Sequence, residues 1–261
     1  MIDIQNQPDF RKIPIDKVGI KGLKYPVKVQ DKTRGIQSTV AEIGMYVDLP
    51  HQCKGTHMSR FVEILNTSRT RVSLESLTTI LGDMKKILGA ESSHIEIKFP
   101  YFIEKKAPST GAKGLMDYTC TISGSSDAEN NTDIILKVAV PVTSVCPCSK
   151  EISEYGAHNQ RGEVLVKTRF KKLIWIENIV EIVENSASCD IFSVLKRADE
   201  KFVTEKAYNN PKFVEDIVRD VGKALMDDKN ITWFSVSAEN FESIHNHSAY
   251  AYIEKKNGQA D

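Results

Sequence analysis

The chain has 261 residues, and 41% of them are hydrophobic, which is enough for a substantial core. Lysine plus arginine equals aspartate plus glutamate at 35 each, so the chain lacks the overall positive field on which non-specific nucleic-acid binding depends. The polar first ten residues and the absence of a long apolar run predict neither a signal peptide nor a membrane-spanning helix. We therefore expect a cytoplasmic protein without nucleic-acid or membrane partners, whose five cysteines are reduced.

The first half of the chain predicts two strands, two helices and two further strands, in that order. Polar and apolar residues alternate in the strand-like segments, which indicates strands with one buried face. In the second helix, apolar residues share one stripe behind Ser73, a suitable N-cap. The expected strands are 25–30, 37–49, 94–102 and 117–123, and the expected helices are 58–65 and the segment after Ser73.

The second half repeats this order. Its last helix carries a start signal, because Asn210 can cap it and Pro211 suits the first helical position. The expected strands are 134–142, 163–170, 231–238 and 249–253, and the expected helices are 175–185 and 211–227.

These elements predict an α+β protein of two strand-strand-helix-helix-strand-strand units, residues 1–132 and 133–261. Each unit would be an antiparallel sheet with helices on one face, and the second would carry most of the candidate site residues. The halves share almost no sequence identity, so the duplication is inferred from the pattern alone. A single unit would leave its sheet edges bare, and closure by oligomerisation is therefore expected.

The strongest local signal for chemistry is the Cys-Pro-Cys sequence of Cys146 and Cys148, followed ten residues later by His158. Thiolate and imidazole suit a borderline-soft divalent metal, and three protein ligands with an open position would make a catalytic site. The alternative is a pair of buried thiols beside an ordinary loop. The histidines further along the chain favour the metal site.

His245 and His247 are separated by one residue, so in an extended strand they would share a face. A pair of imidazoles is useful for metal binding or proton transfer, and a polar hairpin with two solvated rings is the alternative. Among the acidic residues, Glu215 lies beside the apolar stripe of the last helix, where a carboxylate could accept paired hydrogen bonds from a ligand. Taken alone, it is equally a helix-surface charge, as are Glu200 and Glu205.

The segment from Lys54 to Phe61 joins a strand to a helix, so its amides and Arg60 could bind phosphate at the helix N-terminus. In isolation this motif is weak, and His57 could equally be a capping or packing residue.

Four segments resemble the type IB GTP cyclohydrolase family. They are GTHMSRF at 55–61, PVTSVCPCSKEISEYGAHNQR at 141–161, KRADEKFVTEKAYNNPKFVEDIVRD at 196–220 and ENFESIHNHSAYAY at 239–252. They are long, unusual and in the family's order, and the departures lie in loops, chiefly 123–133, and in the tail after Glu254. The resemblance implies a bimodular tunnelling fold, a homotetramer with active sites at subunit interfaces, and conversion of GTP and water to formate and 7,8-dihydroneopterin triphosphate. That reaction would be the first step of tetrahydrofolate biosynthesis.

The resemblance also implies roles for individual residues. One divalent ion per active site, zinc, manganese or iron, would be held by residues that resemble the family's ligands: Cys146, His158 and Glu200. The groups near the reacting ring would be Cys148, His245 and His247, and the division of roles between the two thiols stays open. Glu215 resembles the residue that anchors guanine. The candidate cations for the triphosphate are Lys54, Arg60, Lys150 and Arg161.

In the expected mechanism, the metal lowers the pKa of bound water towards about 7, and hydroxide attacks C8 of the purine. His245 protonates the neighbouring ring nitrogen, Cys148 moves protons during formyl hydrolysis, and Glu215 positions the base. Two alternatives remain. One is a related tunnelling-fold enzyme acting on another pterin or a deazapurine. The other is a non-catalytic protein whose structural metal sits in a closed four-ligand site.

Overall fold

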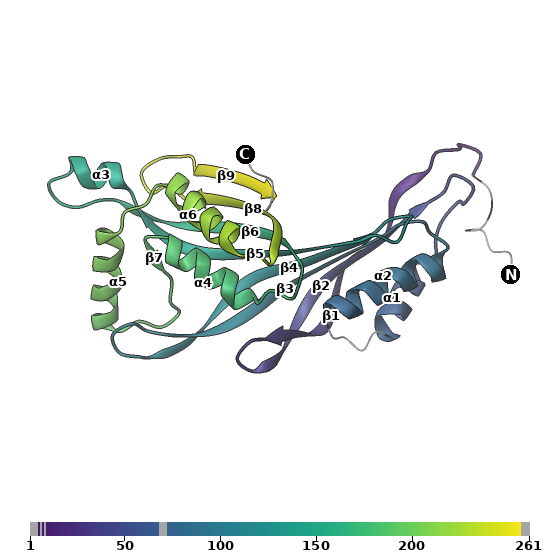
Figure 1. Ribbon diagram of the computed structural model, residues 1–261, viewed down its shortest axis with the longest axis horizontal. Helices are drawn as coiled ribbons and strands as arrows, with labels where there is room; N and C mark the ends of the chain where they lie inside the picture. The colour runs from purple at the N-terminus through teal and green to yellow at the C-terminus, as the bar shows by residue number, and fades with distance from the viewer. Residues whose placement is uncertain (1–4, 6, 8, 68–71, 257–261) are drawn as a thin grey trace. The chain divides into compact units, whose positions relative to one another are not determined.

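The computed structural model describes residues 5, 7, 9–67 and 72–256 (Figure 1). The first half of the chain forms β1 (Ile15–Asp31), β2 (Gly35–Leu49), α1 (Met58–Thr67), α2 (Leu74–Leu88), β3 (Ser93–Lys106) and β4 (Lys113–Ser126). The second half forms β5 (Thr132–Val145), α3 (Pro147–Ile152), β6 (Asn159–Phe170), α4 (Ile176–Ser186), β7 (Cys189–Asp190), α5 (Arg197–Asn209), α6 (Val214–Asp227), β8 (Ile231–Asn240) and β9 (Ala249–Lys256). Every predicted strand and helix is present in the predicted order.

The strands pair in an antiparallel sheet. Within the described residues, nine strands join in the order β1-β2-β3-β4-β5-β6-β8-β9, with β7 paired to β5. The pairs β1-β2, β2-β3, β6-β8 and β8-β9 are antiparallel, as is β5-β7. This arrangement confirms the α+β class and the antiparallel sheets expected from the alternating patterns.

The chain divides into two compact units, Met1–Pro100 with Thr121–Leu136, and Tyr101–Cys120 with Lys137–Asp261. The expected division at residue 132 differs from this one, because it leaves the β3–β4 hairpin with the first unit. In the structure this hairpin bonds to α4 of the second unit: Tyr101 donates to Glu177 at 2.6 Å and Tyr118 donates to Glu184 at 2.8 Å. The tip of the hairpin, Tyr101–Cys120, therefore belongs to the second unit.

In the first unit, α1 and α2 contact each other and the strands β1 and β2. The predicted cap of α2 is confirmed, since Ser73 Oγ accepts from the N–H of Ser76 at 3.2 Å and Ser76 Oγ accepts from the N–H of Ser73 at 2.9 Å. Gly89 ends the helix with a φ of 65°, a left-handed conformation that glycine adopts without strain.

In the second unit, α4 and α6 contact each other, and α6 lies on β8 and β9 (Figure 1). The predicted start of α6 is wrong, because the helix begins at Val214 with Phe213 as its N-cap. The side chain of Asn210, expected to cap α6, instead donates to Ala187 O at 2.9 Å. The start of α6 is instead capped by the side chain of Asp216, which accepts from the N–H of Phe213 at 3.0 Å.

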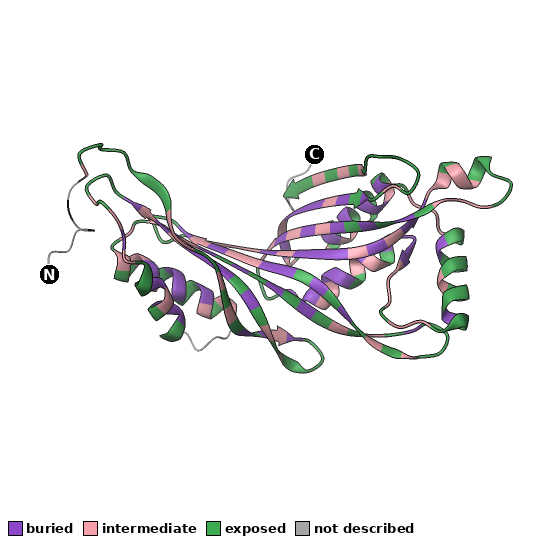
Figure 2. Cartoon of the chain, turned by 180° about the vertical axis from the view of Figure 1, so that it is seen from behind, coloured by how far each residue is buried: buried purple, intermediate pink, exposed green. Residues whose placement is uncertain are grey.

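The patterns did not predict α3, α5 and β7. Most of α5 is exposed (Figure 2), so it lacks the apolar stripe that marks a helix in sequence. It is held by the buried Asp199, which accepts from the N–H groups of Ser109 at 2.8 Å and Thr110 at 2.9 Å in the β3–β4 hairpin. None of the described helices combines the length and apolar composition needed to cross a membrane.

Candidate active site

Cys146 and His158 lie opposite each other where β5 ends and β6 begins. The N–H of Cys146 donates to the carbonyl of His158 at 3.2 Å, and further into the same ladder Gln160 Nε2 donates to Ser144 Oγ at 2.9 Å. Opposed residues of an antiparallel pair project from the same face, with Cβ atoms about 4.5–5.5 Å apart. The thiol and the imidazole therefore share one face of the strand ends.

The imidazole of His158 is oriented through Nδ1, which is 3.0 Å from Gln160 Oε1. Because Gln160 uses its NH₂ group to donate to Ser144, the oxygen of the amide faces the ring and accepts from it. In the tautomer with the proton on Nδ1, Nε2 presents its lone pair, as in metal-ligating histidines whose second nitrogen donates to a fixed acceptor.

A carboxylate absent from the predicted site, that of Glu242, lies 4.0 Å from His158 Nδ1. The hydroxyl of Ser243 is 3.4 Å from the same nitrogen. Both residues follow β8, which pairs with β6 so that Gly162 opposes Asn240, and Phe241 then donates to Arg161 O at 2.9 Å. Continuing that register carries Glu242 to the face of His158, so only knowledge of the strand pairing would have identified it.

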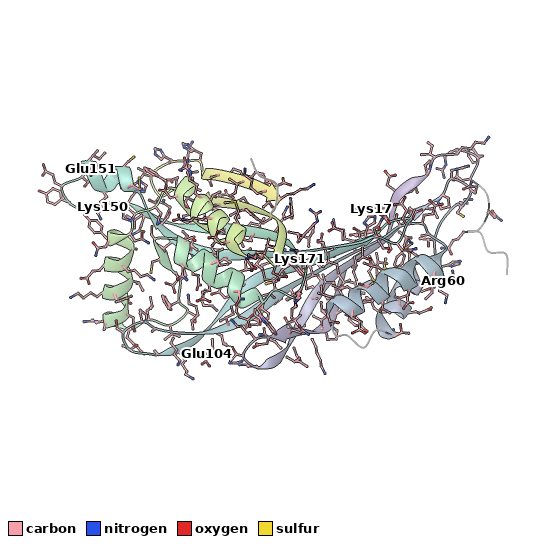
Figure 3. The ribbon with its side chains drawn as sticks, in the orientation of Figure 1. Lys17, Arg60, Glu104, Lys150, Glu151 and Lys171 are labelled. Atoms are coloured by element: carbon pink, nitrogen blue, oxygen red, sulfur yellow. The ribbon has the colours of Figure 1, made fainter. Side chains whose placement is uncertain are left out.

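The thiol of Cys146 caps the short helix α3, and its sulfur accepts from the N–H of Ser149 at 3.5 Å. Cys148, the second residue of α3, is exposed. Lys150, labelled in Figure 3, donates to the carbonyl of Tyr208 at 2.6 Å and lies 4.3 Å from the centre of its ring. This candidate cation is therefore engaged in tethering α3 to the end of α5.

Glu215 is exposed in the first turn of α6. The N–H of Lys212, three residues earlier, donates to Val145 O at 3.1 Å, so α6 begins beside the end of β5 and Cys146. His245 and His247 are exposed in the loop that carries Glu242, and their rings stack with centroids 5.1 Å apart. Thiol, imidazole and carboxylate groups from four segments thus gather at the same end of the second unit.

Glu200 does not join this group within the chain. It is exposed one turn before Val203, which with Ala207 lines a cavity of about 380 Å³. Ala157 and Asn159 line the same cavity, and alternation along the extended segment directs the side chain between them, His158, to the other side. Among the described residues, no three histidine, cysteine or acidic side chains are close enough to hold a metal ion.

The remaining candidate cations are divided between the two units. In the first unit, Lys54 is exposed before α1, and Arg60 donates from Nη1 to Ile87 O at 3.2 Å. In the second unit, Arg161 is exposed and lines the 380 Å³ cavity.

The family model for type I GTP cyclohydrolase folE2 matches residues 1–251 of the chain. The chain belongs to this family. Among similar proteins, the GTP cyclohydrolase FolE2 of Desulfosudis oleivorans is 61% identical over 253 residues, which cover 97% of each chain. That of Geobacter sulfurreducens is 59% identical over 260 residues, which cover all of both chains. The resemblance inferred from the four segments is confirmed.

Solved structures with a similar fold include uricases. A uricase from Bacillus fastidious gives a TM-score of 0.58 at 9% identity and covers 92% of this chain and 93% of its own. A hyperthermostable mutant of the urate oxidase from Bacillus sp. TB-90 gives 0.52 at 10% identity and covers 93% of this chain and 98% of its own. These similarities concern the fold alone, and they confirm the tunnelling fold predicted for this folE2 family member.

Proposed function

We propose that the protein hydrolyses GTP to formate and 7,8-dihydroneopterin triphosphate, in the first step of tetrahydrofolate biosynthesis. The observation that carries this proposal is the family match over residues 1–251, with relatives of the same name about 60% identical along nearly the whole chain. The match includes every segment that contributes to the candidate site. We further propose that the protein acts in the cytoplasm as a homotetramer with active sites at subunit interfaces.

The donor set of the second unit fits one divalent ion, zinc, manganese or iron. Cys146 supplies a thiol that a metal can deprotonate, and His158 is held with Nε2 as the lone-pair nitrogen. When bound, such an ion would lower the pKa of a bound water to about 7 and so supply a nucleophile suited to attack on C8 of guanine.

The third ligand in this proposal is Glu200, in a site completed across a subunit interface. Glu242 belongs to the same chain as His158, and its carboxylate lies 4.0 Å from Nδ1, the nitrogen beside Gln160. In this proposal the carboxylate helps to orient the imidazole, as the carboxylate partners of metal-bound histidines do. Within the described residues, Glu200 forms no group with Cys146 and His158, which supports a site completed across an interface.

The other groups act on the substrate. Glu215 accepts from the guanine N1–H and 2-amino group and so fixes the base. His245, stacked on His247, protonates the ring nitrogen as the C8–N bond breaks, and Cys148 moves protons during hydrolysis of the formyl group.

Cations are proposed to bind the triphosphate. In this proposal they are Lys54, Arg60 and Arg161, with Lys150 holding α3 in place through Tyr208. Removing any one of these cations should lower the affinity for GTP. The affinity for a guanine nucleoside should stay nearly unchanged, because a nucleoside carries no phosphate charge.

Release of formate from GTP, together with a fluorescent pterin product, tests the reaction itself. Two variants of the same short motif then separate the roles of the thiols. Cys146→Ala is expected to abolish turnover and reduce the metal content, whereas Cys148→Ala is expected to keep the metal and slow the reaction. Metal loss in Cys148→Ala alone would exchange the two roles, and wild-type protein that releases no formate from GTP would refute the proposed function.

A further inference from the structure

The peptide unit that precedes Cys146 is held from both sides. The N–H of Val145 donates to Ser188 Oγ at 3.1 Å, and the carbonyl of Val145 accepts from the N–H of Lys212 at 3.1 Å. Val145 is 3% exposed and Ser188 is fully buried. The direction in which the chain leaves β5 towards Cys146 therefore depends on two later segments.

Ser188 stands where the ladder between β5 and β7 stops. The ladder pairs Val142 with Asp190 and Thr143 with Cys189, and the same register would set Val145 opposite Ala187. At that point the hydroxyl of Ser188, and not a backbone carbonyl, accepts from the N–H of Val145. Because a buried N–H without an acceptor is costly, an oxygen on the side chain of Ser188 is required there.

Asn210 holds the backbone around Ser188. Its side-chain nitrogen donates to Ala187 O at 2.9 Å and to Ser188 O at 3.4 Å, and its own N–H donates to Ala207 O at 3.2 Å. One amide therefore ties the turn after α4 to the end of α5. Lys212, which binds the carbonyl of Val145, follows Asn210 by two residues and leads directly into α6.

This junction links two groups of the proposed site. The end of β5 leads into Cys146, and the start of α6 carries Glu215 three residues after Lys212. We propose that Ser188 and Asn210 are positioning residues that set the separation between the Cys146 thiol and the Glu215 carboxylate. The inference rests on the proposed function, in which these two groups fix the metal and the guanine base. Ser188 and Asn210 themselves contact neither.

The expected consequence is a loss in kcat with little change in KM. Glu215 can bind guanine wherever the metal lies, but C8 reacts only at the correct distance, and a displacement of about 1 Å can cost about 100-fold in rate. The geometry of Cys146 also affects the ion directly. Loss of an outer partner of a ligand typically costs about 10- to 100-fold in metal affinity.

The test compares Ser188→Ala with Ser186→Ala in the full-length protein. Ser186 is a matched control, since it is 7% exposed and its hydroxyl donates to Ile182 O at 2.8 Å, within α4 and away from the junction. Zinc affinity is measured on metal-free protein by competition with a chelating dye, and kcat and KM are measured with GTP. Ser188→Ala is expected to lose about 10-fold or more in zinc affinity and in kcat, with KM within about twofold of wild type.

Asn210→Ala supplies a second variant at an incompletely buried position, and it decides the question if Ser188→Ala does not fold. It should show the same fall in kcat and in zinc affinity. Both variants matching Ser186→Ala in the two quantities would overturn the inference, as would a rise in KM alone. Failure of the proposed function is distinguishable, because wild-type protein would then release no formate while the zinc affinities could still be compared.

Discussion

Lys105 is a buried ammonium group of the second unit, and its replacement by methionine tests how strongly its ion pairs stabilise that unit. Nζ lies 2.8 Å from Glu184 Oε1 and 2.7 Å from Asp190 Oδ2, and it donates to Ile191 O at 2.9 Å. Only 11% of the side chain is exposed. Methionine keeps an unbranched stem of similar length but leaves both carboxylates without this partner.

The size of the effect follows from what the carboxylates retain. Removing one partner from a buried ion pair typically costs about 3–5 kcal/mol, because the other charge stays buried. Asp190 keeps Lys206 at 3.0 Å and Glu184 keeps the hydroxyl of Tyr118 at 2.8 Å, which places Lys105→Met at the lower end. A loss of about 3 kcal/mol corresponds to a fall of roughly 6–12 °C in the melting temperature for a protein of this size.

The deficit should depend on pH with a definite sign. Burial raises the pKa of Glu184 even with Lys105 present, and removing the ammonium raises it further. A carboxyl group whose pKa is raised in the folded state contributes most to folding stability at pH values below its unfolded pKa. That contribution to stability is lost as the pH rises through the folded pKa. The deficit of Lys105→Met is therefore expected to be larger at about pH 8 than at about pH 5.

Unfolding followed by circular dichroism at both pH values measures this deficit in Lys105→Met and in Lys105→Met with Glu184→Gln. The second change removes one unpaired charge and should recover part of the stability. A stability deficit below about 1 kcal/mol would refute the reasoning, since it would be no larger than that of an exposed ion pair. A deficit that is equal at both pH values would also refute it.

Three further predictions concern the second unit. Burial acts to raise the pKa of Asp199, but hydrogen bonds from Thr110 and the surrounding backbone lower it to about 2, so the stability it contributes is present above the usual 3.8 and lost as the pH falls towards 2. Asp199→Asn should therefore unfold at lower urea than wild type at neutral pH, and the difference in midpoint should close across that acidic range. Glu242→Gln should retain the fold and lower zinc affinity by about 10-fold, as measured by chelator competition; unchanged affinity would remove its orienting role. Gly162→Ala would place a Cβ 2.6 Å from Asn240 Oδ1 and 3.0 Å from Glu239 O. This variant should lower the free energy of unfolding, measured with urea, by about 1–3 kcal/mol.

The sequence predicts the fold best where apolar residues follow a clear period. In α2 the stripe and the Ser73 cap are both found as expected. By contrast, α5 has little apolar surface and depends on Asp199, whose partners lie in a hairpin about 90 residues earlier. Asn210 shows a different limit of sequence-based prediction. Its side chain is suited to capping a helix, but its amide donates to the carbonyl of Ala187 and does not cap α6. A local pattern carries no information about such distant partners.

The same distinction applies to the candidate site. Cys146 and His158 are near in sequence, and a single hairpin brings them together. Glu242 reaches His158 through the pairing of β6 with β8, which no local motif specifies. For Glu200, resemblance supplies a role, but within the described residues it forms no group with Cys146 and His158.

The contact between Ser243 and His158 joins residues 85 positions apart, which constrains the order in which the site can form during synthesis. The turn that opposes Cys146 and His158 needs only local chain closure, so it can form soon after that segment leaves the ribosome. The β8–β9 loop, which encloses the imidazole, arrives with the last strands of the chain. A nascent protein would thus hold its thiol and imidazole together before the surrounding acidic and hydroxyl groups are in place.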